Sequence, residues 1–96
     1  MIVSFHPLAE RELNDAAQYY EMESPRLGDA FLDEVERCCA SIVAHPESGH
    51  AIRGAVRRRL IARFPYAILY TLRPDAVRVV AVMNMKRRPG YWVGRA

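Results

Sequence analysis

Residues 56–70 read VRRRLIARFPYAILY, a basic half followed by an apolar half. Alternation in the basic half predicts a strand with two faces, Val56, Leu60 and Ala62 on one and Arg57, Arg59 and Ile61 on the other. Arg58 breaks the pattern because it falls on the apolar face. Pro65 has no N–H for a sheet ladder, so we expect a bend at Phe64-Pro65. The continuous apolar run at 66–72 then predicts a central strand that is buried on both faces.

A second apolar run follows at residues 77–83, and the turn residues Arg73-Pro74-Asp75 separate it from the first. We expect these two runs to form a tight antiparallel hairpin. The second run continues into a basic, aromatic tail, NMKRRPGYWVGR (residues 84–95). Pro89-Gly90 predicts a turn there, with residues 91–93 returning as a short closing segment. Cations therefore stand at the ends of buried strands, as in a surface for a polyanion or an acidic partner.

The chain upstream begins with a short β-rich stretch, residues 2–5. His6-Pro7 ends this strand and opens a helix, because proline suits the first helical position. Apolar residues then recur at helical spacing, and the helix is expected to end near Glu23.

A second helix follows after a short connection. Ser24 is expected to cap it, and Ala44-His45-Pro46 ends it. The short connection predicts an antiparallel helix hairpin. Glycine and polar residues at 47–54 predict a loop.

Together these elements predict one α+β domain over residues 1–96. An N-terminal strand and the antiparallel helix hairpin pack on a three- to four-stranded antiparallel sheet. We expect the hairpin to cover one face of the sheet and the other face to carry arginines and a partner.

The net charge of +3 hides a strong asymmetry between the two halves of the chain. Residues 1–50 hold three Lys or Arg and ten Asp or Glu, whereas residues 51–96 hold eleven basic residues and one acidic residue, Asp75. Such a basic half suggests nucleic acid, a ribonucleoprotein or an acidic protein as the partner.

The remaining composition excludes several classes of protein. No apolar run reaches the ~20 residues of a membrane-spanning helix, and the start is not a signal peptide, so we expect a cytoplasmic protein without membrane contact. The adjacent Cys38 and Cys39 lack zinc-site spacing and are interpreted as one core and one boundary thiol. No nucleotide-binding, nucleophile or metal motif is present, so no cofactor is expected.

The motifs in this order resemble the RelE/ParE superfamily of toxins from bacterial type II toxin–antitoxin systems, and its ParE-like subgroup in particular. The matching segments are residues 17–21, 27–31, Pro46, 56–58 together with 63–70, and 87–92 followed by Arg95. They cover nearly the whole chain. The resemblance implies a fold like that of small microbial ribonucleases, and a cognate antitoxin whose C-terminal segment wraps the toxin in a hetero-oligomer.

The resemblance also implies a mode of action, and it leaves more than one open. Some members arrest growth by poisoning DNA gyrase, and others cleave mRNA in the ribosome. The RNases usually carry an arginine at the position of Ala67, and close relatives of the subgroup a histidine at that of Asn84. We therefore expect target binding first, ribosome-dependent mRNA cleavage second, and a non-toxic antitoxin-binding relic third.

The candidate site consists of the cations and aromatic residues of the basic half. The predicted target- or antitoxin-binding residues are Arg57, Arg59, Arg63, Arg87, Arg88, Trp92 and Arg95. If the protein is an RNase, the predicted catalytic residues are Arg57, Arg63 and Arg87 on the phosphate and Tyr91 near the scissile bond. The histidines His6, His45 and His50 lie at predicted helix ends or in a loop. Structural roles remain open: charge on an edge strand for the arginines, an ion pair to the helices for Arg63, and capping of the sheet for Tyr91 and Trp92.

Overall fold

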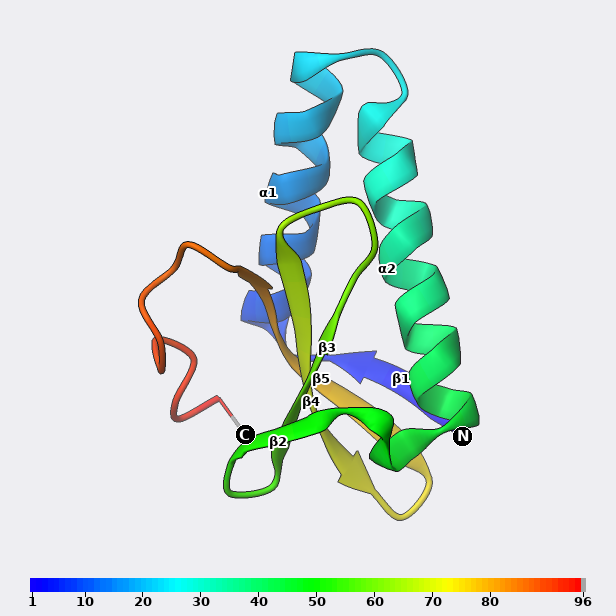
Figure 1. The fold of residues 1–96 in the computed structure, drawn as a ribbon, viewed down its shortest axis with the longest axis vertical. Helices are drawn as coiled ribbons and strands as arrows, with labels where there is room; N and C mark the ends of the chain where they lie inside the picture. Colours follow the sequence, from blue (N-terminus) through cyan, green and yellow to red (C-terminus); the bar gives the residue numbers. More distant parts are fainter. Residues whose placement is uncertain (96) are drawn as a thin grey trace.

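The apolar hairpin of the sequence forms the centre of a five-stranded sheet in the computed structural model, which describes residues 1–95. The elements follow in the order β1 (Ile2–Phe5), α1 (Pro7–Glu23), α2 (Leu27–Ala44), the 3-10 helix η1 (Pro46–Ser48), β2 (His50–Arg53), β3 (Val56–Leu60), β4 (Tyr66–Arg73) and β5 (Ala76–Asn84). The two helices stand side by side and antiparallel on one side of the sheet (Figure 1). The α+β class and the helix hairpin are therefore confirmed.

The sheet has the order β1-β5-β4-β3-β2, and it differs from the prediction in two ways. It is mixed, because β1 pairs in parallel with β5, Ile2 opposite Ala76 and Phe5 opposite Val79. It also contains β2, in residues predicted as a loop, which pairs antiparallel with β3. Between Gly49 and Gly54 this strand has a single large apolar residue, Ile52, which is too little to show a period of two.

The two faces of β3 lie as the alternation predicted. Val56 packs on the face away from the helices, and Ile61, just past the strand, is buried under them. The strand ends at Leu60 rather than Ala62, and Arg63 adopts φ 72° in the bend before Pro65. β4 and β5 form the expected hairpin, with Arg73 opposite Ala76.

The helix hairpin forms without the predicted Ser24 cap. Ser24 instead ends α1, donating its backbone N–H to the Tyr20 carbonyl. α2 begins after Arg26, and the Glu21 carboxylate of α1 accepts from the backbone N–H groups of Arg26 and Gly28, both at 3.0 Å. A carboxylate from the neighbouring helix thus satisfies the free N–H groups at the start of α2. Gly28 is needed at this crossing, because a Cβ there would lie 2.5 Å from the Ala17 carbonyl oxygen.

The sheet has an apolar core on each face. On the helix side, Phe31 and Ile42 of α2 pack against Ile68 and Tyr70 of β4. On the opposite side, Ala67 and Leu69 pack with Val80, Ala81, Met83 and Trp92. The prediction that β4 is buried on both faces is therefore confirmed. Both Cys38 and Cys39 are buried, so the interpretation of one as a boundary thiol is wrong.

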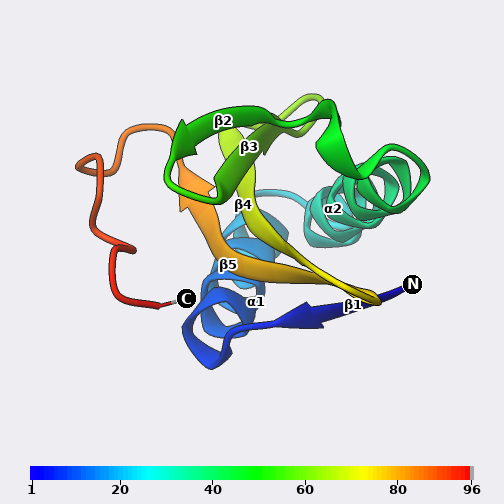
Figure 2. The same cartoon turned by 90° about the horizontal axis from the view of Figure 1, so that it is seen from below.

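The segment after β5 lies on the side of the sheet away from α2 (Figure 2, orange to red). It forms successive turns, and the short closing segment predicted at 91–93 is one of them, with the Val93 N–H donating to the Gly90 carbonyl at 3.0 Å. Among the described residues, no helix is long and apolar enough to cross a membrane.

Candidate functional site

Three consecutive arginines of β3 point to two different faces of the sheet. Arg57 donates through Nη1 to the Gly49 carbonyl at 2.9 Å and to the Glu47 carbonyl at 3.1 Å. Arg59 reaches the Ser48 hydroxyl at 2.6 Å and the Ser41 hydroxyl of α2 at 3.0 Å. Both guanidinium groups thus bind the chain's own loop and helix on the inner, helix-covered side of the sheet.

Arg58 points the other way and lines a cleft of about 360 Å³ on the face opposite the helices. We call this cleft the basic groove. Its cations are Arg53 of β2, Arg58 of β3 and Arg87 from the segment after β5. Its other lining residues are Ile52, Met83, Met85, Pro89, Gly90 and Trp92. No carboxylate or imidazole is among these lining residues, so the groove combines positive charge with an apolar floor.

Residues 85–95, which we call the C-terminal strap, form one wall of the groove. Trp92 anchors the strap in the core of this face and is 7% exposed. Gly90 adopts φ 81°, a conformation that favours glycine and turns the strap before Trp92. The predicted residues Arg87 and Trp92 therefore lie together in the groove.

Tyr91 lies between two arginines of the strap. The guanidinium carbon of Arg87 is 3.9 Å from the Tyr91 ring centroid, and that of Arg95 is 4.9 Å away. Burial raises the pKa of Tyr91 well above its ordinary value, and the nearby Glu12 carboxylate raises it further, while Arg95 and Arg87 oppose this only in part. A tyrosine general base would need the opposite shift. Tyr91 is therefore suited to stacking with these two arginines rather than to proton transfer.

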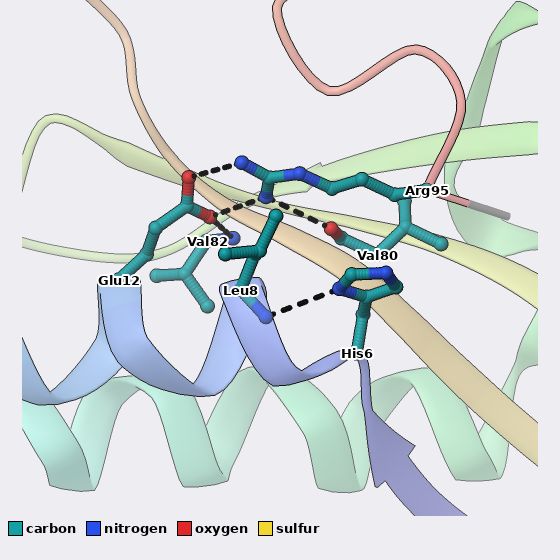
Figure 3. Close-up of polar contacts among 6 residues, drawn as sticks. All are labelled: His6, Leu8, Glu12, Val80, Val82 and Arg95. Carbon is teal, nitrogen blue, oxygen red and sulfur yellow. Dashed lines mark hydrogen bonds and ion pairs between the residues drawn. The ribbon is translucent and has the colours of Figure 1, made fainter.

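The predicted binding residue Arg95 is engaged inside the molecule (Figure 3). It forms a bidentate ion pair with Glu12 of α1, with both N–O distances at 3.0 Å, and donates to the Val80 carbonyl at 3.2 Å. Figure 3 shows the Glu12 carboxylate between Arg95 and the backbone N–H of Val82, from which it accepts at 3.0 Å.

The predicted residues Arg63 and Arg88 do not line the groove. Arg63 stands in the β3–β4 bend, with its guanidinium carbon 5.6 Å from the Phe64 ring centroid, and Phe64 belongs to the helix-side core. Arg88 is exposed on the strap. The predicted cluster is thus divided among four places, which are the inner face (Arg57, Arg59), the bend (Arg63), the strap and groove (Arg87, Arg88, Trp92) and the contact with α1 (Arg95).

Sequence reasoning missed Arg53 and Arg58 as groove residues. For Arg58 the signal was present, since it interrupted the alternation on the apolar face of β3. For Arg53 no signal existed without the pairing that places it opposite Val56.

One histidine reaches the same face. His50 lies opposite Arg58 in the β2–β3 ladder, so the two side chains share a face of the sheet, although His50 does not line the groove. His6 instead caps the start of α1, where its Nδ1 accepts a hydrogen bond from the Leu8 N–H at 3.1 Å. Within residues 1–95, no three His, Cys, Asp or Glu side chains gather where they could hold a metal ion.

Comparison with known proteins agrees with this fold. Residues 3–89 match a family described as the ParE toxin of the type II toxin-antitoxin system, parDE. A solved structure described as the chromosomal ParDE TA system from P. aeruginosa superposes with a TM-score of 0.77, covering 90% of this chain and 97% of that chain at 13% sequence identity. No curated protein sequence matches. Because the family match spans most of the sequence, this chain belongs to the ParE toxin family of type II toxin–antitoxin systems.

Proposed function

We propose that this protein arrests growth by binding DNA gyrase through the basic groove, without hydrolysing its target. Gyrase is the family's example of such a target. The observation that carries the proposal is the lining of the groove, where three arginines surround an apolar floor with no acid–base pair among them. Arginines around an apolar centre favour strong binding to an acidic surface. The pKa of Tyr91, the candidate base, is raised, which is the opposite of the shift that a general base needs.

The same groove is the proposed site of neutralisation. We propose that a cognate antitoxin lays an acidic, amphipathic segment along it, as the family membership suggests. Its apolar side chains would cover Met83 and Trp92, and its carboxylates would pair with Arg53, Arg58 and Arg87. Toxin and antitoxin would then form a hetero-oligomer in the cytoplasm, where the proposed targets are found.

A second candidate function is ribosome-dependent cleavage of mRNA. The position of His50 favours it, because the β2–β3 ladder places this histidine on the face of Arg58. An imidazole beside arginines could remove a proton from a 2′-hydroxyl while the arginines hold the phosphate. In this alternative Arg53, Arg58 and Arg87 bind phosphate, and His50 takes the role that was predicted for Tyr91.

Induced expression without any antitoxin separates these functions. Growth arrest with intact mRNA and an SOS response would support gyrase binding, whereas cuts at defined codon positions in primer extension would support the RNase. Arg58→Ala and Arg87→Ala are each expected to weaken target binding about tenfold or more. Arg73→Ala is the matched control, since Arg73 is exposed at the β4–β5 turn outside the groove.

His50→Gln distinguishes the two active candidates directly. It should leave gyrase-type arrest unchanged and abolish any mRNA cleavage, because glutamine cannot shuttle a proton. Absence of arrest in the wild-type protein, with the fold intact, would contradict both candidates and leave the non-toxic antitoxin-binding relic.

A further inference from the structure

We propose that Glu12 is a positioning residue for the basic groove. Its carboxylate holds Arg95, and through Arg95 it fixes the C-terminal strap that forms one wall of the groove. Its consequence for toxicity rests on the function proposed above, but its effect on the strap does not. Glu12 belongs to the acidic half of the sequence and is remote from the groove along the chain.

The need for such a residue begins with the unequal lengths of β1 and β5. β1 pairs only with residues Ala76 to Val79, whereas β5 continues to Asn84. Past Val79 this edge of β5 has no neighbouring strand within residues 1–95, although Val80 and Val82 are almost fully buried. Buried backbone groups without hydrogen bonds are costly.

Glu12 and Arg95 supply the hydrogen bonds that a longer β1 would have made. The carboxylate of Glu12 accepts from the Val82 N–H at 3.0 Å, and the guanidinium of Arg95 donates to the Val80 carbonyl at 3.2 Å. The two side chains then join each other through the bidentate pair (Figure 3). This side-chain bridge both satisfies the edge of β5 and ties the end of the strap to α1.

The ion pair between Glu12 and Arg95 is largely shielded from water, so it holds the end of the strap strongly. The side chains of Arg95 and Glu12 are only 12% and 16% exposed. Charge pairs in such surroundings are screened less by solvent than pairs on the surface. The bidentate geometry also fixes the orientation of the guanidinium.

The strap connects this ion pair to the wall of the groove. It is anchored in its middle by Trp92 and at its end by Arg95. Between β5 and these anchors lie Arg87 and Gly90, which line the groove. Along the chain, Trp92 lies between β5 on one side and the Arg95 ion pair on the other. If that ion pair is lost, the strap loses this attachment beyond Trp92, and the groove wall can move. Glu12 thereby controls the groove without touching its occupant.

The single tryptophan of the chain reports the strap directly. We expect Glu12→Ala and Arg95→Ala each to shift Trp92 emission to longer wavelength and to increase its quenching by acrylamide. The double variant should behave like either single variant, because both remove the same tie. Glu12→Gln keeps an acceptor for the Val82 N–H, so it should move Trp92 while Val82 amide exchange stays slow. In Glu12→Ala that exchange should accelerate about tenfold or more.

Controls separate positioning from a general loss of stability. Glu10→Ala removes an exposed carboxylate from the same helix and should change neither signal. Arg58→Ala should impair growth arrest without moving Trp92, whereas Glu12→Gln should do both while urea unfolding remains cooperative. An unchanged Trp92 signal in both Glu12→Ala and Arg95→Ala would overturn the proposal. If the wild-type protein causes no arrest, the proposed function fails, but the fluorescence and exchange measurements still decide the role of Glu12.

Discussion

Arg57 and Arg58 are neighbours in β3, yet they belong to different parts of the molecule. Arg57 is engaged by the carbonyl oxygens of the η1–β2 segment on the inner face. Arg58 faces an open cleft that also contains Arg53 and Arg87. The arginines of β3 therefore form two sets, one that stabilises the structure and one that faces a partner, because successive side chains of a strand point to opposite faces.

The strongest way to disturb the inner set is to disturb its loop at Gly49. The Tyr70 hydroxyl accepts from the Gly49 N–H at 2.9 Å and donates to the Pro46 carbonyl at 2.7 Å. A Cβ at Gly49 would lie 2.8 Å from Cε1 of Tyr70, which is fully buried and cannot move aside. Gly49→Ala should therefore lower the free energy of unfolding by about 2–3 kcal/mol in urea titrations.

Gly54→Ala is the control for this experiment. Gly54 has φ 54° but open space around its Cα, so only backbone strain of about 1 kcal/mol is expected. Equal losses at the two glycines would show that the loop does not depend on its contact with Tyr70.

The paired substitutions Arg57→Ala and Arg58→Ala test the comparison itself. Arg57→Ala removes two charge-assisted hydrogen bonds and should cost about 2 kcal/mol of unfolding free energy. The Glu47 carboxylate lies 3.8 Å from Nη2 of Arg57, but the Glu47 side chain is 83% exposed. This ion pair therefore contributes little to stability. Arg58→Ala should cost less than about 0.5 kcal/mol, as expected for a surface position, while it impairs growth arrest.

The opposite result for this pair would reverse the assignment. If Arg58→Ala destabilised the fold and Arg57→Ala abolished arrest in a stable protein, the inner face rather than the groove would be the binding site. Urea unfolding and growth assays on the same two variants decide between these outcomes.

A smaller effect is expected from pH, and it also distinguishes the two faces. Burial on the inner face raises the pKa of Cys39 from its ordinary value of 9.0 to about 12. Above about pH 9 the unfolded thiol loses its proton while the folded thiol keeps it, so rising pH favours unfolding. Between pH 8 and pH 10 this should remove about 1 kcal/mol of stability.

Three variants assign this alkaline loss to a face. Burial also raises the pKa of the neighbouring Cys38, so Cys39→Ala should remove only part of the difference between pH 8 and pH 10, and the double variant Cys38→Ala/Cys39→Ala should remove most of it. Tyr91→Phe, on the strap, should retain most of it, because an unfolded tyrosine begins to ionise only near its ordinary value of 10.0. A loss that disappeared with Tyr91→Phe instead would locate the titrating group on the groove side.

Much of the fold could be predicted from local patterns. The period of the apolar residues predicted both helices and the β4–β5 hairpin, and His6-Pro7 marked the boundary between β1 and α1. β2 was missed because its four residues carry no periodic signal and it is a strand only through its pairing with β3. The parallel pairing of β1 with β5 joins the two ends of the chain, and no local pattern encodes it.

For the site, local sequence patterns were enough to predict the number of arginines, their concentration in the second half, and the alternation that sets Arg58 apart from Arg57 and Arg59. Which of these arginines are free to bind a partner depends on tertiary contacts. Arg95 had the same appearance as Arg87 in the sequence, but Glu12 and the open edge of β5 engage it inside the molecule. His50 joined the face of Arg58 in the same way, through pairing between strands. A side chain's residue type and strand face are local properties, whereas its hydrogen-bond partners and its burial depend on segments that only folding brings together.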